Sequence, residues 1–168
     1  DWVRERRADL MLAGIVLLVA AIPRLVELSS YPWALSGDEG TFAVTIDGVT
    51  ETISGYAGGK TPDPTYGSHK GYVEALKVTY DPSKVTYAKL LDHYWHNIDP
   101  FDPTGQFCDK GPAYRTVVFV SDDEEKALAE KTKQEIAERF DKEVATEIRP
   151  TTTFYAAEDY HQDYHNQN

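Results

Sequence analysis

The alternation of apolar and polar residues is clearest along Val73–Tyr80, which is followed by the turn residues Asp81 and Pro82. Successive side chains of a strand point to opposite faces, so this segment is predicted to be a strand with Glu74 on the same face as Leu76, Val78 and Tyr80. A carboxylate is therefore expected among apolar neighbours at one end of the strand.

Helical patterns follow this strand in two places. Apolar residues recur every three or four positions over Thr86–Ile98, and Ser121 with Glu124 fits a capping box for a helix ending near Phe140. Further strands are predicted at Thr50–Tyr56, Arg115–Val120 and Val144–Ile148, with Gly- and Pro-rich loops at Gly55–Tyr66 and Asp99–Ala113. The order predicts an α/β (α+β) fold, a two-layer sandwich with helices on one face of a small sheet.

The N-terminal segment differs from the rest of the chain. Basic residues precede an apolar run, Leu10–Pro23, which Arg24 follows. This pattern is typical of a signal peptide or membrane anchor, although the run is shorter than the roughly 20 residues that span a bilayer. With Arg24 reaching the interface, residues 8–28 would be long enough. A buried core helix and a segment without a native role are the other interpretations, and membrane contact through residues 10–28 is one expectation.

Composition limits the classes of function. The chain has 168 residues and a formal net charge of −11, which gives room for one ordinary domain and argues against a nucleic-acid partner. Its one cysteine, Cys108, excludes an intramolecular disulfide and a thiolate zinc cluster. No two-cysteine redox cycle can run within the chain.

Several polar residues are candidates for chemistry. Burial would raise the pKa of Glu74 and suit it to donate a proton near neutral pH, whereas a strand-end Glu that reaches solvent is the simpler alternative. Tyr66 and Tyr114 lie in the two loops, and Asp109 shares the loop of Tyr114. The hydroxyl groups of the two tyrosines can donate hydrogen bonds to a polar oxygen, although most tyrosines in proteins contribute to packing.

Two other candidates are weaker. His161 and His165 have the spacing of a helical metal pair, but no third ligand is evident, so we expect a polar surface and no metal or cofactor. Cys108 has Asp109 beside it, and a neighbouring carboxylate disfavours a reactive thiolate. A structural or incidental cysteine is the favoured interpretation.

A series of motifs in order resembles the A-type peptide methionine sulfoxide reductases over about residues 47–168. The motifs are GVTETISGYAGG, TPDPTY, GYVEALKVTYDP, NIDPFDPTGQFCDKGPAYRT, TEI and FYAAEDYHQDY. The resemblance implies a cytoplasmic enzyme of protein repair with a two-layer α/β core. It would reduce the S epimer of methionine sulfoxide, free or in peptides, with thioredoxin as the reductant.

The resemblance also implies roles for individual residues. In the family a cysteine thiolate attacks the sulfoxide sulfur while the oxygen is protonated and leaves. The acid glutamate of the family matches Glu74, its oxygen-binding tyrosines match Tyr66 and Tyr114, and its loop aspartate matches Asp109.

The chain departs from the family at the nucleophile. The family's Gly-Cys-Phe-Trp motif is absent, and counting back from Gly48 to its cysteine reaches Leu35. The family's first strand, first helix and aromatic methyl pocket are therefore expected to be missing or replaced, which would expose a sheet edge. The loop after Tyr66 is shorter than in the family, and Gly71-Tyr72 stands where Gly-His is usual. The chain is also expected to lack the C-terminal stretch of the usual resolving cysteines.

Residues 1–42 resemble the first membrane segment of lipid-linked sugar glycosyltransferases, with Asp38 at the acidic position. We therefore predict two parts, 1–42 and 43–168, joined near residues 42–47. Three functions remain open. The first is a reductase that is impaired or inactive because the nucleophilic cysteine is absent. The second is a non-catalytic module that binds methionine sulfoxide, and the third is a chimeric chain without function.

Overall fold

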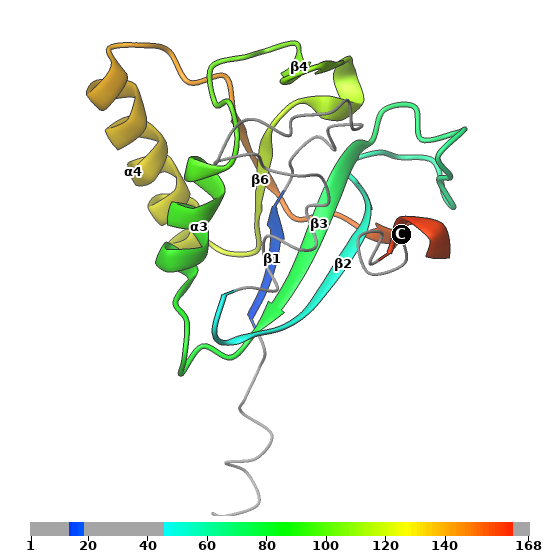
Figure 1. Cartoon of the computed structure of the whole chain (residues 1–168), viewed down its shortest axis with the longest axis horizontal. Coiled ribbons are helices and arrows are strands. Elements are labelled where there is room, and N and C mark those ends of the chain that lie inside the picture. The colour runs from blue at the N-terminus through cyan, green and yellow to red at the C-terminus, as the bar shows by residue number, and fades with distance from the viewer. Residues whose placement is uncertain (1–13, 19–45, 163–168) are drawn as a thin grey trace, which may run out of the picture.

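A computed structural model describes residues 14–18 and 46–162 of the chain (Figure 1). Within these residues, six strands form a sheet in the order β7-β6-β1-β3-β2-β8. These strands are β1 (Gly14–Leu18), β2 (Val49–Ala57), β3 (Val73–Tyr80), β6 (Val117–Val120), β7 (Glu147–Pro150) and β8 (Tyr155–Ala156). A separate two-stranded hairpin consists of β4 (Gly105–Gln106) and β5 (Asp109–Lys110).

Strand β1 lies in the middle of the sheet, between β3 and β6 (Figure 1). It pairs antiparallel with both, with Leu18 opposite Leu76 on one side and opposite Val118 on the other. The predicted apolar helix is therefore wrong at residues 14–18, and the sheet does not lack a first strand. A short apolar run suits a central strand as well as a buried helix, since neither leaves a polar face.

The remainder of the N-terminal segment lies outside the described residues, and so do residues 42–45 of the predicted junction, Asp38 and Leu35. Among the described residues, no helix has the length and apolar character needed to cross a membrane. The resemblance of residues 1–42 to a glycosyltransferase membrane segment thus gains no support from the described part of the chain.

Two α-helices pack together on one side of the sheet (Figure 1). They are α3 (Tyr87–His96) and α4 (Asp123–Phe140). The capping residues of α4 are one position later than predicted: Asp122 accepts from the Glu125 N–H at 2.8 Å, and Glu125 Oε2 accepts from the Ser121 N–H at 2.8 Å. Asp122 thus caps the helix, which begins at Asp123, and Glu125 returns its side-chain bond to Ser121, the residue before the cap.

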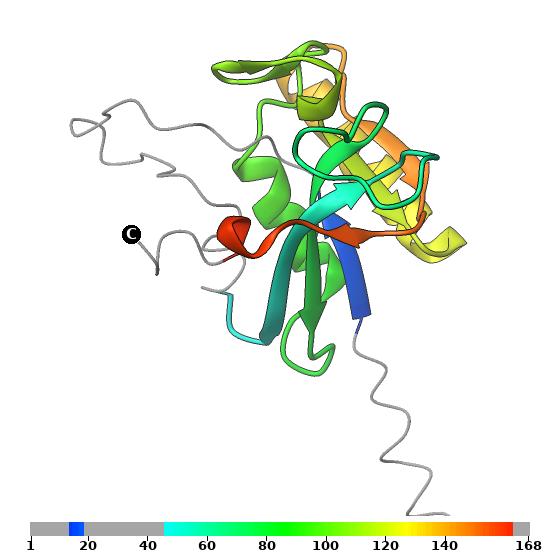
Figure 2. The ribbon, with the colours of Figure 1, turned by 90° about the vertical axis from the view of Figure 1, so that its right-hand side faces the viewer.

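The core confirms the predicted alternation along β3. Leu76, Val78 and Tyr80 belong to the large apolar cluster that the helices cover, and Val73 and Ala75 belong to a smaller cluster on the opposite face. Figure 2 shows the C-terminal segment lying along β2, where β8 pairs with Gly55 and Tyr56. The architecture is a mixed α/β fold in which both faces of β3 are covered near its start.

Three other elements differ from the sequence prediction. The last predicted strand begins later, because Ala145 and Thr146 donate their N–H groups to the Pro100 carbonyl and pairing with β6 begins at Glu147. The predicted second loop contains the hairpin β4–β5 and the 3₁₀ helix η1 (Pro112–Tyr114). A second 3₁₀ helix, η2 (Asp159–His161), follows β8.

Candidate active site

Glu74 lies near the start of β3 with only 4% of its surface exposed. Burial raises the pKa of its carboxyl from 4.5 to about 7, against a lowering contribution from His69 and with a smaller raising contribution from Asp109. The atom Oε1 has no hydrogen-bond partner among the described residues. The predicted burial of Glu74 is confirmed. At neutral pH about half of the Glu74 carboxyl groups carry a proton, and that proton can be donated to an acceptor that the protein itself does not supply.

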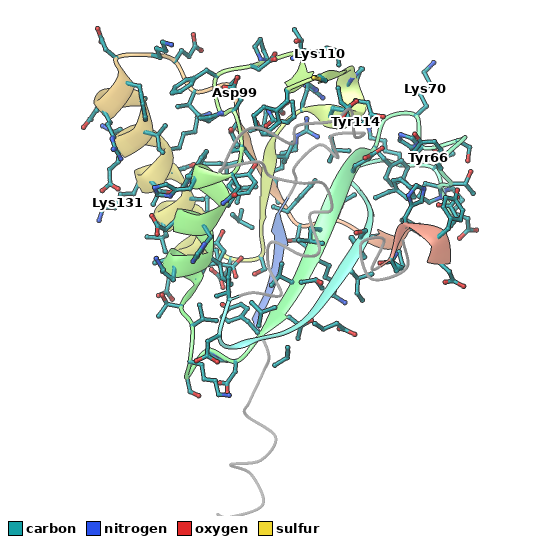
Figure 3. All side chains as sticks on the ribbon, in the orientation of Figure 1. Tyr66, Lys70, Asp99, Lys110, Tyr114 and Lys131 are labelled. Atoms are coloured by element: carbon teal, nitrogen blue, oxygen red, sulfur yellow. The ribbon has the colours of Figure 1, made fainter. Side chains whose placement is uncertain are left out.

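Tyr66 and Tyr114 both lie near this end of β3, where Figure 3 labels them. Tyr66 comes from the loop after β2 and Tyr114 from η1, and an interaction with the Tyr66 side chain is the smallest of the contributions that raise the pKa of Tyr114. Burial raises the pKa of Tyr114 to about 12, with a further contribution from the charge of Glu74. Both hydroxyl groups can act as donors beside Glu74, although Tyr66 keeps 39% of its surface exposed.

Asp109 reaches the same place from the β4–β5 hairpin. Its charge contributes to raising the pKa values of both Glu74 and Tyr114. The fully buried side chain of Gln106 holds the hairpin to the chain: its Oε1 accepts from the Asp99 N–H at 2.8 Å and its Nε2 donates to the Asp99 carbonyl at 2.8 Å. The structure thus brings the four predicted side chains within electrostatic reach of one another, while their catalytic roles stay predictions.

Cys108 occupies the turn between β4 and β5 and is exposed. Its neighbour Phe107 has a φ of 44°, in the left-handed region, which forms the tight turn. No other thiol exists in the sequence. The position fits an incidental cysteine on a hairpin tip.

A pocket beside Glu74 includes residues that the sequence analysis did not select. It is lined by Ser54, Gly55, Tyr56, Tyr66, Glu74, Ala75, Ala157 and His161. Gly55 is required here because a Cβ atom would lie 2.2 Å from the Tyr155 carbonyl oxygen, so β8 could not approach. The pocket therefore depends on a close approach of β2 to the C-terminal segment.

Glu158 ties three parts of the pocket together. Its Oε2 accepts from the Tyr56 hydroxyl at 3.0 Å, and its Oε1 accepts from the Tyr66 N–H at 2.9 Å. These bonds, led by the one from the Tyr66 backbone, lower the pKa of Glu158, so it is ionised at neutral pH. No local pattern marks this residue, because its partners are about 100 positions away in sequence.

His161 packs its ring 5.0 Å from that of Tyr66, and its Nε2 has no hydrogen-bond partner among the described residues. His165, the other half of the proposed metal pair, lies outside the described residues. The described part of the chain holds no group of three or more His, Cys, Asp or Glu side chains suited to a metal ion. His161 thus lines the pocket and carries a buried ring nitrogen without a hydrogen-bond partner among the described residues.

Comparison with known proteins gives consistent matches. A family model for peptide methionine sulfoxide reductase matches residues 37–168. The peptide methionine sulfoxide reductase MsrA of Listeria welshimeri is 44% identical over 127 residues, covering 72% of this chain and 72% of that protein.

Solved structures agree in fold. Methionine sulfoxide reductase A of Corynebacterium diphtheriae matches with a TM-score of 0.74 and 24% identity, over 93% of this chain and 75% of that one. Reduced Mxr1 from Saccharomyces cerevisiae matches with a TM-score of 0.72 and 24% identity, over 92% and 85%. The same yeast protein in complex with Trx2 matches with a TM-score of 0.58 and 22% identity, over 90% and 84%. At these identities the solved structures show the fold alone.

Proposed function

The chain belongs to the peptide methionine sulfoxide reductase family, and we propose that its pocket recognises the oxygen of methionine sulfoxide while its own capacity for reduction is impaired. The observation that carries the proposal is the Glu74 carboxyl, which is buried, has a pKa near 7 and has a buried oxygen without a partner. A sulfoxide oxygen is a strong acceptor without a proton of its own. It would satisfy the donor that the protein leaves unpaired.

The tyrosines complete the recognition of that oxygen. Tyr114 stays protonated because its pKa is about 12, and its hydroxyl lies with that of Tyr66 beside Glu74. In the proposal, one or both hydroxyls and the protonated Glu74 carboxyl donate hydrogen bonds to the sulfoxide oxygen. In the family reaction the same acid would also supply the proton that the oxygen gains when its bond to sulfur breaks. A thioether has no such oxygen, so reduced methionine leaves these donors without an acceptor.

Reduction requires a second group. In the family reaction a thiolate attacks the sulfur, the sulfur–oxygen bond breaks, methionine is released and the cysteine is oxidised to a sulfenic acid. Cys108 is this chain's single thiol, and it lies exposed on the hairpin tip. Glu74 supplies protons but no electrons, so recognition without efficient turnover is the function that we propose.

Thioredoxin belongs to the same proposal as the expected reductant. The yeast relative Mxr1 has been solved with Trx2, and reduction by a dithiol acts on an oxidised cysteine. In this chain, Cys108 is the one residue that could form an oxidised cysteine for thioredoxin to reduce. We therefore expect thioredoxin to add little to any turnover.

A turnover assay tests the proposal. The purified chain is incubated with an oxidised methionine peptide and dithiothreitol, and methionine release is compared with that of the Listeria welshimeri relative and of the Cys108→Ser variant. We expect release at the level of the buffer for both forms of the chain. Turnover near that of the relative would overturn the proposed impairment, and its loss in Cys108→Ser would then identify Cys108 as the nucleophile.

A further inference from the structure

The ring of His69 faces the Glu74 carboxyl, with 4.0 Å between Nε2 and Oε1. We propose that His69 is a positioning residue for Glu74 and passes protons between solvent and this buried carboxyl. The inference deepens the proposed function, since it rests on Glu74 as the proton donor of the sulfoxide site.

The polypeptide holds His69 in place from both sides. Ser68 donates its N–H to the Thr65 carbonyl at 2.8 Å, and Tyr72 donates its N–H to the His69 carbonyl at 2.9 Å. The imidazole itself stacks on Tyr56, with 5.0 Å between ring centroids and 14° between planes. The ring therefore has one face and both flanking turns fixed.

The hydrogen bond on the far side of the ring decides which nitrogen carries a proton. Nδ1 of His69 lies 3.1 Å from the Thr65 carbonyl oxygen, which only accepts, so Nδ1 carries a hydrogen in either charge state. Nε2 is then the nitrogen that gains or loses a proton, and it is the one that faces Glu74. Neutral His69 can accept from a protonated Glu74, and protonated His69 can donate to the carboxylate.

The difference in solvent exposure between His69 and Glu74 sets the direction in which protons pass between them. The side chain of His69 is 17% exposed and that of Glu74 only 5%, so solvent reaches the imidazole more readily than the carboxyl. When Glu74 is ionised, the proton on Nε2 of protonated His69 can move to Oε1, which restores the hydrogen-bond donor of the site, and solvent then restores the proton of His69. The gap of 4.0 Å exceeds hydrogen-bond length, so a small rotation of either side chain must close it.

Other titratable groups face the pair from every neighbouring element. They are Tyr56 on β2, Tyr66 in the loop, Asp109 on β5, Tyr114 on η1 and His161 on η2. Burial, and then the hydrogen bond to Glu158, raises the pKa of Tyr56, and Tyr114 is also protonated at neutral pH. Among the groups facing Glu74, His69 is the one whose charge favours the ionised carboxylate.

Nuclear magnetic resonance titration of the full chain without ligand tests the inference. Carbon signals of the Glu74 carboxyl and nitrogen signals of the His69 ring are followed across the neutral range. In the unmodified chain the charge of His69 should hold the Glu74 midpoint below the value it has without that cation. In His69→Phe, which keeps a ring against Tyr56, the midpoint of Glu74 should rise by about one pH unit because the cation is gone. His69→Gln should give the same rise without the ring.

His96→Phe is the matched control, because His96 is an exposed histidine that pairs with Asp92 on α3. It should leave the Glu74 midpoint unchanged. An identical Glu74 midpoint in the unmodified chain and in His69→Phe would overturn the inference and leave the ring a packing residue. Since no ligand is present, this result is independent of whether the chain binds methionine sulfoxide.

Discussion

The hydroxyl of Tyr56 donates a hydrogen bond of 3.0 Å to Glu158, a residue 102 positions later in the sequence. The same carboxylate accepts from the backbone of Tyr66 at 2.9 Å. One side chain of the C-terminal segment therefore fixes both the floor of the pocket on β2 and the loop that presents a predicted oxygen-binding tyrosine.

The substitution Glu158→Ala should lower the free energy of unfolding by about 1–2 kcal/mol, because two hydrogen bonds to a charged group are lost and Tyr56 is left without its acceptor. Chemical denaturation at neutral pH measures the change. Asp159→Ala, at the exposed next position, should have little effect. Equal effects of the two substitutions would mean that Glu158 does not hold the pocket.

The pH dependence of stability should report the buried carboxyl of Glu74. Its folded-state pKa of about 7 lies above its ordinary value of 4.5, so its stabilising contribution is complete below about pH 4.5 and is lost as pH rises through 7. Relative to Glu74→Gln, which cannot ionise, the unmodified chain should lose about 3 kcal/mol between these limits. Parallel stability profiles of the two proteins would show that Glu74 is not desolvated.

The cap of α4 provides a test of local structure. Asp122→Ala removes the side chain that accepts from the Glu125 N–H and should cost about 1 kcal/mol of stability. Glu124→Ala changes the residue that the sequence pattern favours as the capping partner and should cost much less, because its position is exposed within the first turn. Thermal melts of the two variants separate these cases.

The central position of β1 should protect its backbone from hydrogen exchange. Its residues pair with β3 on one side and, at Leu17 and Leu18, with β6 on the other. A peptide covering residues 14–18 should therefore exchange as slowly as one from β3, and far more slowly than one from the exposed loop around Gly67. Fast exchange at 14–18 with β3 still protected would contradict its place in the sheet.

Local patterns predicted those features that depend on local structure. The period of two along β3 placed Glu74 with Leu76 and Val78, and the period of the helix located α3 to within two residues at its ends. The same local information could not identify β1, because an apolar run of this length has the same pattern in a central strand and in a buried helix.

Two residues of the site, His69 and Glu158, could not be predicted from the sequence because their roles depend on tertiary contacts. His69 and Glu158 gain their importance from the residues opposite them, Glu74 and Tyr56, and neither has a periodic or spaced pattern. Strand alternation and loop position made Glu74, Tyr66, Asp109 and Tyr114 candidates, and the family resemblance implied their roles. Their convergence on one end of β3 depends on the fold that joins these loops.

Titration calorimetry with matched peptides tests most directly whether the site recognises the sulfoxide oxygen. The chain is titrated at about pH 6 with a peptide containing methionine sulfoxide and with the same peptide containing methionine. We predict that the oxidised peptide binds at least about tenfold more tightly, the equivalent of one hydrogen bond between neutral groups. This preference should weaken above pH 7, persist without pH dependence in Glu74→Gln and fall sharply in Glu74→Ala, in which only the tyrosine hydroxyls remain as donors. Glu124→Ala is the unaffected control. Equal affinity for the two peptides in the unmodified chain would contradict the account.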